Sequence, residues 1–204
     1  MWVYTSVDRP PPDEPQAHEA ILAPGVRISG MSVDWHVHWT RAMENMLDWP
    51  HLPFVHASTI GRALVARSRT ARMDIETEDH PWGFRSHILV DGVAERGVLD
   101  FRWPNQMNLH IPIRNKKLFL MVACVPIDAE RTRMLLVTAR NFLTWPLFDR
   151  LFNRSNLRIA TQDRAILESS QPLQVPDARA EKSVRTDAPV LSFRKAYFAR
   201  LKAR

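Results

Sequence analysis

Two histidines five positions apart are the residues of this sequence whose types and spacing best suit metal chemistry. His51 and His56 follow an amide and a carboxylate, Asn45 and Asp48, on the same short stretch of chain. Neutral imidazole binds Fe, Zn, Cu and Ni, so the two histidines alone do not select a metal. With one carboxylate from elsewhere they could form a 2-His-1-carboxylate triad, which holds Fe(II) and leaves positions open for O2 and substrate.

A second pair of histidines, His36 and His38, lies just upstream. Alternate residues of a strand face the same side, so both imidazoles could be ligands of a barrel-type metal site. Trp35, Val37 and Trp39 would then occupy the other face, which is the pattern of a half-buried strand with its histidines outward. We therefore favour surface or supporting roles for His36 and His38.

The composition describes a chain that can form one folded domain. Of its 204 residues, 45% are hydrophobic, which is enough for a sizeable core. No apolar run reaches the roughly 18 residues of a membrane span, and the N-terminus does not have the pattern of a signal peptide. The single cysteine, Cys124, excludes an intrachain disulfide framework and lies in an apolar run, so we expect a buried structural thiol. These features favour a cytoplasmic location.

The net charge of +6 and the pI near 10.1 raise the question of nucleic-acid binding. However, the basic residues are scattered among 22 acidic ones, and the densest groups lie at 62–72 and 194–204. Neither group interleaves aromatic with basic side chains as a surface for single strands would. Solvated faces, and no nucleic-acid partner, are the better interpretation.

The first 16 residues predict a boundary between domains. Residues 9–16, RPPPDEPQ, form a proline-rich linker that suits neither helix nor strand. Residues 2–4 resemble the last strand of something that precedes them. We therefore expect residues 1–16 to be a remnant strand and linker, and residues 17–204 to be the functional domain of a longer protein.

Hydrophobic patterning predicts an α+β fold. A strand is expected over 26–39, followed by an N-cap at Thr40, a helix over 41–47 and a helix end or bend at Pro50. About six antiparallel strands follow, mostly joined as hairpins, at 72–77, 84–90, 98–103, 107–113, 118–125 and 133–140. A long helix is expected over 146–170 with a break near Asn153, and a final strand or helix over 190–204. This order predicts a twisted sheet folded around a helix.

The spacing of the two histidines and the two polar residues before them carries a family resemblance. The run Asn45-x2-Asp48-x2-His51-x4-His56 resembles the iron-binding motif of Rieske-type non-haem iron oxygenases. The branch it most resembles includes the vanillate and dicamba demethylases and pheophorbide a oxygenase. The resemblance covers nearly the whole chain after residue 8. It implies the helix-grip (START/Bet v1-like) catalytic domain, with an antiparallel sheet wrapped around a long C-terminal helix.

The third ligand is supplied by the resemblance and not by the residue pattern. An acidic residue on an amphipathic helix usually faces solvent, and nothing in the pattern singles out Asp163. Segment 162–172, QDRAILESSQP, is similar to the late helix that carries the carboxylate ligand in this family. By that match His51, His56 and Asp163 would hold mononuclear Fe(II). From ligand types alone the same three residues could bind zinc in a hydrolase, although no glutamate adjoins either histidine as in zinc protease motifs.

The resemblance also implies roles for the two upstream polar residues. Asp48 would orient an imidazole ligand and carry electrons from the Rieske cluster of a neighbouring subunit. Asn45 would lie beside the open face of the metal. A ligating histidine generally donates its other N–H to a carboxylate or carbonyl, which agrees with a supporting carboxylate here.

The sequence departs from the family pattern in one large respect. A Rieske [2Fe–2S] cluster needs two cysteines and two histidines, and this chain has one cysteine. The cluster would lie on a missing domain or a partner chain, with a ferredoxin or reductase as electron donor and O2 and a small hydrophobic substrate as reactants. In isolation the chain should bind iron without its electron source. The resemblance implies a homotrimer whose contacts use the missing domain, which leaves the oligomeric state open. The rival interpretation is a non-catalytic helix-grip module that carries an apolar ligand.

Overall fold

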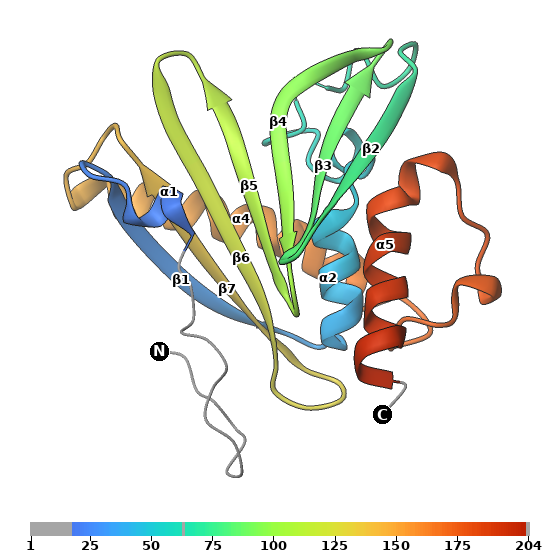
Figure 1. Ribbon diagram of the computed structural model, residues 1–204. Coiled ribbons are helices and arrows are strands. Elements are labelled where there is room, and N and C mark those ends of the chain that lie inside the picture. Colours follow the sequence, from blue (N-terminus) through green and yellow to red (C-terminus); the bar gives the residue numbers. More distant parts are fainter. Residues whose placement is uncertain (1–17, 63, 203–204) are drawn as a thin grey trace.

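A seven-stranded antiparallel sheet forms the centre of the structure, and helices lie against both of its faces (Figure 1). The computed structural model describes residues 18–62 and 64–202. The strands run in the order β1-β7-β6-β5-β4-β3-β2, so that each strand from β2 to β7 pairs with its neighbour in sequence and β1 closes on β7. Their bounds are β1 Arg27–Trp35, β2 Met73–His80, β3 Gly83–Val90, β4 Val93–Arg102, β5 Gln106–Ile113, β6 Lys116–Pro126 and β7 Thr132–Arg140.

The strands follow the alternation of the sequence. In β3 the side chains of Phe84, Ser86, Ile88 and Val90 are buried and the residues between them are partly exposed. The turn at residues 91–92 joins β3 to β4, with positive φ values of 52° for Asp91 and 79° for Gly92. Two successive positive φ values are those of a type I′ turn, which matches the right-handed twist of a hairpin. Local turn chemistry therefore sets the register of this hairpin.

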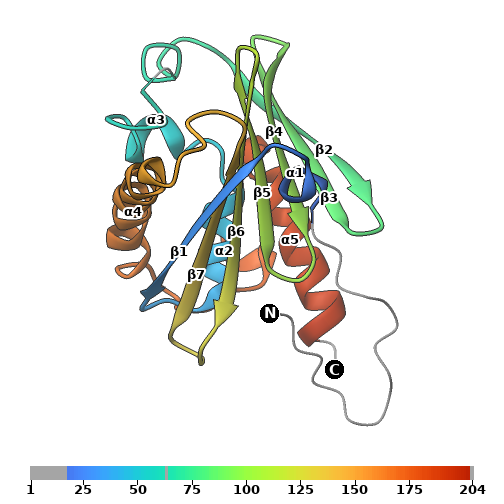
Figure 2. The same ribbon diagram turned by 90° about the vertical axis from the view of Figure 1, so that its left-hand side faces the viewer.

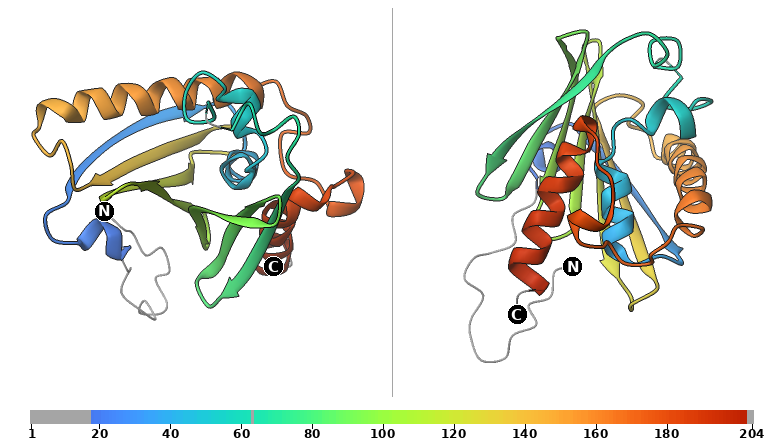
Figure 3. Two further views of the ribbon diagram at one scale, coloured as in Figure 1. Left: turned by 90° about the horizontal axis from the view of Figure 1, so that it is seen from above. Right: turned by 90° about the vertical axis from the view of Figure 1, so that its right-hand side faces the viewer.

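The helices divide between the two faces of the sheet (Figures 2 and 3). The short helix α1 (Glu19–Leu22) covers one face, and α4 (Leu147–Leu167) runs along β1 and β7 on the other. Helix α2 (Trp39–Leu47) lies on the same side as α4, between α4 and α5 (Ala188–Tyr197). The single-turn α3 (Leu52–Val55), two 3-10 turns (Ala178–Ala180 and Arg185–Asp187) and a final π-helical turn (Phe198–Lys202) complete the described elements.

The expected α+β architecture, an antiparallel sheet around a long helix, is confirmed. All six strands expected between residues 72 and 140 are present, and the strand expected at 26–39 becomes the seventh. The long helix is α4, and α5 follows it as a helix in the region where either a strand or a helix was expected. The proposed remnant strand and linker at 1–16 lie outside the described residues.

Three local predictions are wrong. The first strand ends at Trp35, and α2 begins at Trp39 with His38 as its N-cap, in place of Thr40. The side chain of His38 accepts a hydrogen bond from the Thr40 backbone N–H, which is the interaction that defines an N-cap. Helix α4 is continuous through Asn153, whose side-chain amide donates to the Gly30 carbonyl. Asn153 fixes the helix to β1 and does not break it.

The residues around His36 and Cys124 agree with the sequence interpretation. Trp35, Val37 and Trp39 are buried, and His36 is exposed. Cys124 is fully buried, and burial raises the pKa of its thiol. Among the described residues, no helix is both long and apolar enough to cross a membrane.

A closed ring of four charges holds α2 against α5. Arg41 pairs with Glu44 (2.9 Å) and Glu181 (2.8 Å), and Arg194 pairs with the other oxygens of Glu44 and Glu181, the latter at 2.6 Å. Arg194 is 4% exposed and Glu44 is 8% exposed. Each buried charge is therefore compensated by two partners of opposite sign. The ring fixes the helix that leads directly into the two histidines.

We predict that Glu44→Ala lowers the free energy of unfolding by about 3 kcal/mol, because it leaves the buried Arg194 guanidinium with one partner fewer. Urea denaturation followed by tryptophan fluorescence measures the change. Glu130→Ala, in the exposed turn between β6 and β7, is the control and should stay within about 0.5 kcal/mol of the wild type. A loss in Glu44→Ala no larger than in the control would show that the ring does not support the fold.

Candidate metal centre

His51 and His56 flank a single helical turn. Helix α2 ends at Leu47, as expected for a helix that stops before Pro50, and α3 begins after His51 and ends before His56. His51 is the N-cap of α3 and His56 its C-cap, so one turn separates the two imidazoles, whose ring centroids lie 5.1 Å apart. Gly61 keeps the following loop close, because a Cβ at this position would lie 1.8 Å from the Leu52 carbonyl oxygen.

Helix α4 brings Asp163 to the two histidines. Asp163 is 3% exposed, one of two buried residues on a helix that is otherwise partly or fully exposed. Its Oδ1 lies 3.0 Å from His56 Nε2 and 3.6 Å from His51 Nε2. The structure thus brings Asp163 to two histidines that lie 107 and 112 positions before it in the sequence.

The hydrogen bonds at the far side of each ring determine which nitrogen carries the proton. His51 Nδ1 contacts the backbone carbonyl of Asp48, and His56 Nδ1 lies 3.0 Å from Gln162 Oε1. Both partners are carbonyl oxygens, which accept and do not donate, so each Nδ1 carries the hydrogen. In the neutral imidazole each Nε2 then presents a lone pair toward Asp163.

Gln162 has its amide orientation fixed by neighbours. Its Oε1 also accepts from Thr59 Oγ1 at 3.1 Å, and its Nε2 faces Ser58 Oγ at 3.4 Å. The carbonyl side of the amide therefore faces His56. This is the arrangement of a metal-ligating histidine, whose second nitrogen donates to a carbonyl or carboxylate.

Three electron-pair donors that converge in a buried place repel one another unless a cation or a proton lies among them. Among the described residues, no hydrogen-bond donor contacts Asp163 Oδ1 when both imidazoles are neutral and carry their hydrogen on Nδ1. The two Nε2 atoms could donate to it only if the rings changed tautomer or gained a proton. Metal–ligand bonds of about 2.0–2.2 Å place adjacent ligands roughly 3–3.5 Å apart. The separation of 3.0 Å lies within that range, and the separation of 3.6 Å lies just above it. The donor set, two imidazoles and one carboxylate, fits a divalent transition metal ion.

The electrostatics of the two histidines differ. Burial lowers the pKa of His51, although the charge of Asp163 acts in the other direction. Burial acts in the same sense on His56, but its contacts with Asp163 and Gln162 outweigh it and raise the pKa. The lowered pKa keeps His51 neutral, as a metal ligand must be. A proton on His56 Nε2 would lie between this nitrogen and Asp163, which is also where a bound cation would lie.

The two upstream polar residues lie next to the three donors, with one difference from expectation. Asp48 orients His51 through its backbone carbonyl, and its carboxylate Oδ2 is 3.7 Å from His51 Nδ1, too far for a hydrogen bond. Burial, with the charges of Asp187 and Glu44, raises the pKa of Asp48 to about 6. Asn45 lines the same cavity, and its Nδ2 has no hydrogen-bond partner among the described residues.

An apolar cavity of about 70 Å³ adjoins the three donors. It lies between the sheet and helices α2 and α4, and its polar lining is confined to the residues named above. The rest of the wall is aliphatic, thioether or indole: Trp35, Met46, Trp49, Leu52, Ile60, Leu99, Met107, Leu109, Leu120, Val122, Met134, Leu136, Ile159 and Ala160. A metal centre at one end of an apolar cavity can act on a hydrophobic molecule.

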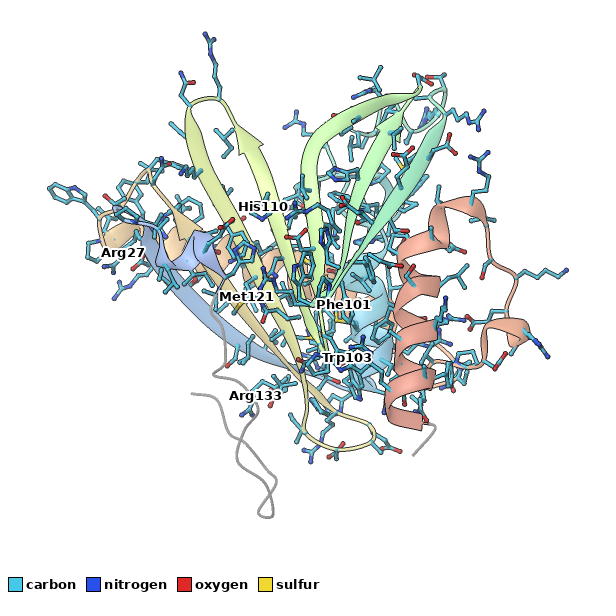
Figure 4. All side chains as sticks on the ribbon, viewed as in Figure 1. Arg27, Phe101, Trp103, His110, Met121 and Arg133 are labelled. Atoms are coloured by element: carbon cyan, nitrogen blue, oxygen red, sulfur yellow. The ribbon has the colours of Figure 1, made fainter. Side chains whose placement is uncertain are left out.

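A second group of possible ligands lies on the opposite face of the sheet, where Figure 4 shows His110. His18 and His110 approach Asp100 Oδ2 at 3.8 and 3.9 Å. The His18 ring, however, accepts a hydrogen bond from the Ala20 N–H on Nδ1, so its Nε2 carries the hydrogen and faces Asp100 as a donor. Asp100 is already held by Arg85 through two bonds of 2.7 and 2.9 Å. Asp100 is thus neutralised by Arg85, and His18 turns a hydrogen and not a lone pair toward it, so this group does not suit a metal.

Sequence reasoning missed Gln162 and Gly61 as supports of the site. Gln162 precedes Asp163 on α4, but no pattern indicates that its amide reaches a ring 106 positions away. The close approach of Gly61 to Leu52 depends on a loop whose path the sequence does not encode in any periodicity. Both roles depend on tertiary contacts, which the sequence pattern does not show.

Comparison with known proteins identifies relatives of this chain. Residues 35–95 and 91–203 match the family model of the vanillate O-demethylase oxygenase C-terminal domain. The methylxanthine N3-demethylase NdmB of Pseudomonas putida is 26% identical over 168 residues, which are 79% of this chain and 46% of that protein.

Solved structures share the fold at lower identity. NdmA of Pseudomonas putida CBB5 superposes with a TM-score of 0.73 at 22% identity, over 89% of this chain and 52% of that one. Dicamba monooxygenase bound to 3,6-dichlorosalicylic acid gives a TM-score of 0.60 at 11% identity, over 92% and 63% of the two chains. This chain thus spans about half the length of NdmB and NdmA.

We predict that Gln162→Leu weakens Fe(II) binding by about 10- to 100-fold, because the acceptor that fixes the His56 tautomer is lost. Anaerobic titration with Fe(II) measures the affinity. Gln171→Leu, at an exposed position after α4, is the matched control and should bind as the wild type does. Equal affinity in Gln162→Leu and the control would contradict the role of the amide.

We further predict that the chain binds one equivalent of Fe(II) and that His110→Ala leaves both stoichiometry and affinity unchanged. The reason is that the network around Asp100 presents a hydrogen, and not a lone pair, from His18. Iron analysis after anaerobic titration and desalting measures the content. A second equivalent that disappears in His110→Ala would overturn this assignment.

Proposed function

The chain belongs to the family of vanillate O-demethylase oxygenase C-terminal domains, and on that premise we propose that it is the catalytic domain of a Rieske-type non-haem iron oxygenase. Its reaction would be the hydroxylation or oxidative demethylation of a hydrophobic cyclic substrate with O2. The observation that best supports the proposal is the convergence of two imidazole lone pairs and one carboxylate at the end of an apolar cavity.

His51, His56 and Asp163 would hold the iron as three ligands, leaving positions on the side of the cavity. Bound Fe(II) supplies the ability to react with O2 next to a substrate, which the protein side chains do not have. The chain's own contribution is positional. Asp48 and Gln162 fix the two rings, and the apolar wall excludes water and holds the substrate beside the three ligands.

Electrons would have to come from outside the 204 residues. A Rieske cluster is held by two cysteines and two histidines, and this sequence contains one cysteine, which is buried in β6. We propose that a Rieske domain on the same or another chain, supplied by a ferredoxin or reductase, delivers them. The Asp48 carboxylate, whose side chain is 36% exposed and lies beside His51, would be a point where such a domain could approach the ligands. A homotrimer, as the family resemblance implies, would supply that domain from a neighbouring subunit.

The rival function, an apolar-ligand carrier without catalysis, has less support. A carrier needs the cavity but has no use for two histidines held in the tautomer that a metal requires. Nor does it need a buried Asp163 on a helix whose other face is exposed. Unpaired buried polar groups are costly, so their convergence favours a bound cation.

The test is anaerobic Fe(II) titration of the wild type beside His51→Ala and Asp163→Ala. We predict one equivalent bound by the wild type and a loss of at least about 100-fold in affinity in each variant, because two protein ligands remain in place of three. His36→Ala and Asp79→Ala remove exposed residues of the same types and should bind as the wild type does. Equal weak binding by all five proteins would contradict the proposed function.

A further inference from the structure

An apolar tip projects from the corner where β7 leads into α4. Trp145 is 73% exposed and Leu147 is 67% exposed, and Leu143 and Leu151 beside them are exposed as well. Figure 3 shows that α4 begins at one end of the molecule, far from α5. Single exposed leucines are ordinary, but four large apolar side chains so close together form a patch of the kind that contacts a membrane or another protein. These four residues are called the apolar tip below.

The tip is held outward by a buried framework. The guanidinium of Arg140 is buried, donates through Nε to the Leu143 carbonyl at 3.2 Å, and pairs through Nη2 with Asp149 on the first turn of α4. The side-chain oxygen of Asn141 accepts from the Lys117 N–H at 2.7 Å. These bonds fix the loop between β7 and α4, so the exposure of the tip is built into the fold.

A row of arginines follows the tip along α4. Arg150, Arg154 and Arg158 are exposed and stand four residues apart, so they lie along one side of the helix. Like charges at this spacing repel and destabilise a helix slightly, unless an anion lies beside them. The two carboxylates of α4 are used elsewhere, Asp149 in ion pairs and Asp163 at the metal centre. The exposed face of α4 is therefore positive throughout.

The turn between β5 and β6 adds cations on the other side of the tip. Arg114, Lys116 and Lys117 are exposed there. The Lys116 ammonium lies 4.9 Å from the centre of the Phe142 ring, which precedes the tip by one residue. None of these three cations, and none of the three arginines on α4, forms an ion pair with a described residue. The apolar tip thus lies among six cations that have no counter-charge within the described part of the chain.

This combination favours an anionic lipid surface over a protein partner. Tryptophan and leucine side chains enter the boundary between headgroups and acyl chains, while arginine and lysine contact anionic headgroups. The positive end of the α4 dipole lies at the same corner and acts in the same sense. A stable protein interface instead needs a broad complementary surface of about 800 Å² on each partner, which a projecting tip does not offer. A second copy of this chain would bring like charges together.

We infer that the apolar tip and the six cations around it form a surface that binds reversibly to membranes containing anionic lipids. The apolar side chains insert among the headgroups, and the cations contact the headgroup phosphates. Such binding places the domain next to a bilayer, where hydrophobic molecules concentrate. The inference goes beyond the proposed function and does not depend on it, because no residue of this surface belongs to the metal centre or lines its cavity.

The test is sedimentation of the full chain with sucrose-loaded vesicles. One set contains equal amounts of phosphatidylcholine and phosphatidylglycerol, and the other contains phosphatidylcholine alone. We expect at least about tenfold tighter binding to the anionic vesicles, since each basic residue near such a surface contributes about fivefold. Added sodium chloride should weaken this binding, because it screens the attraction. Measurements with and without Fe(II) keep iron binding separate from membrane binding.

One set of variants tests the cations. The triple variant Arg150→Gln/Arg154→Gln/Arg158→Gln should bind anionic vesicles about 100-fold more weakly, at about fivefold for each arginine.

A matched triple variant removes the same charge from exposed positions near α5, at the other end of the molecule (Figure 1). It is Arg179→Gln/Lys182→Gln/Lys195→Gln, and its affinity should stay within about threefold of the wild type, because charges farther than a Debye length from the membrane are screened.

A second pair of variants tests the apolar tip. Trp145→Ser should weaken binding to anionic vesicles by at least about tenfold, because it removes the largest apolar side chain of the tip. Val93→Ser is the control, since it removes an exposed apolar side chain from the turn between β3 and β4 and should bind as the wild type does. Both substituted positions are exposed, and circular dichroism checks that the fold is kept.

Four results would overturn the inference. The first is equal or absent binding of the wild type to the two kinds of vesicle. The second is a loss in the control variants as large as that in the variants of the tip and of the arginine row. The third is capture on beads coated with polyglutamate without binding to vesicles, which would assign the surface to an acidic protein. The fourth is a dimer that dissociates in Trp145→Ser, seen by size-exclusion chromatography with light scattering, which would assign it to a second copy.

Discussion

The structure depends on one electrostatic constraint, which is the meeting of three electron-pair donors in a largely buried place. Two backbone or amide carbonyls hold the Nδ1 hydrogens of His51 and His56, and this directs both Nε2 lone pairs at Asp163. Lone pairs at such distances repel unless a cation or a proton lies among them. The fold must therefore be rigid enough to hold the donors together, and the metal would in turn stabilise the fold.

The elements around the site supply that rigidity. The ring of charges between α2 and α5 fixes the helix before His51, and α4 is attached to β1 by Asn153 and to β7 by Asn156, whose amide donates to Thr138 at 2.9 Å. The sheet provides the apolar wall, because alternate residues of its central strands face α2 and α4. The same alternation of side chains along the strands thus builds both the core of the fold and the wall of the cavity.

Most strands and the two histidines could be predicted from the sequence. The features that could not be predicted depend on tertiary contacts. Alternation and turn residues locate the strands, because the side-chain period of a strand is local. His51 and His56 are recognisable because one turn of chain contains both. Asp163 is not distinguishable by pattern from an exposed acidic residue, and only family resemblance indicated it. Gln162, the charge ring and the His38 cap were missed or misplaced because each depends on contacts formed in three dimensions.

The most direct test of the account is the location of iron in a crystal grown and loaded with Fe(II) without oxygen. The account predicts a single anomalous peak at the iron absorption edge, about 2 Å from His51 Nε2, His56 Nε2 and a carboxylate oxygen of Asp163. A crystal that contains iron but shows no peak there would contradict it. A peak beside His18, Asp100 and His110 in place of this site would contradict it as well.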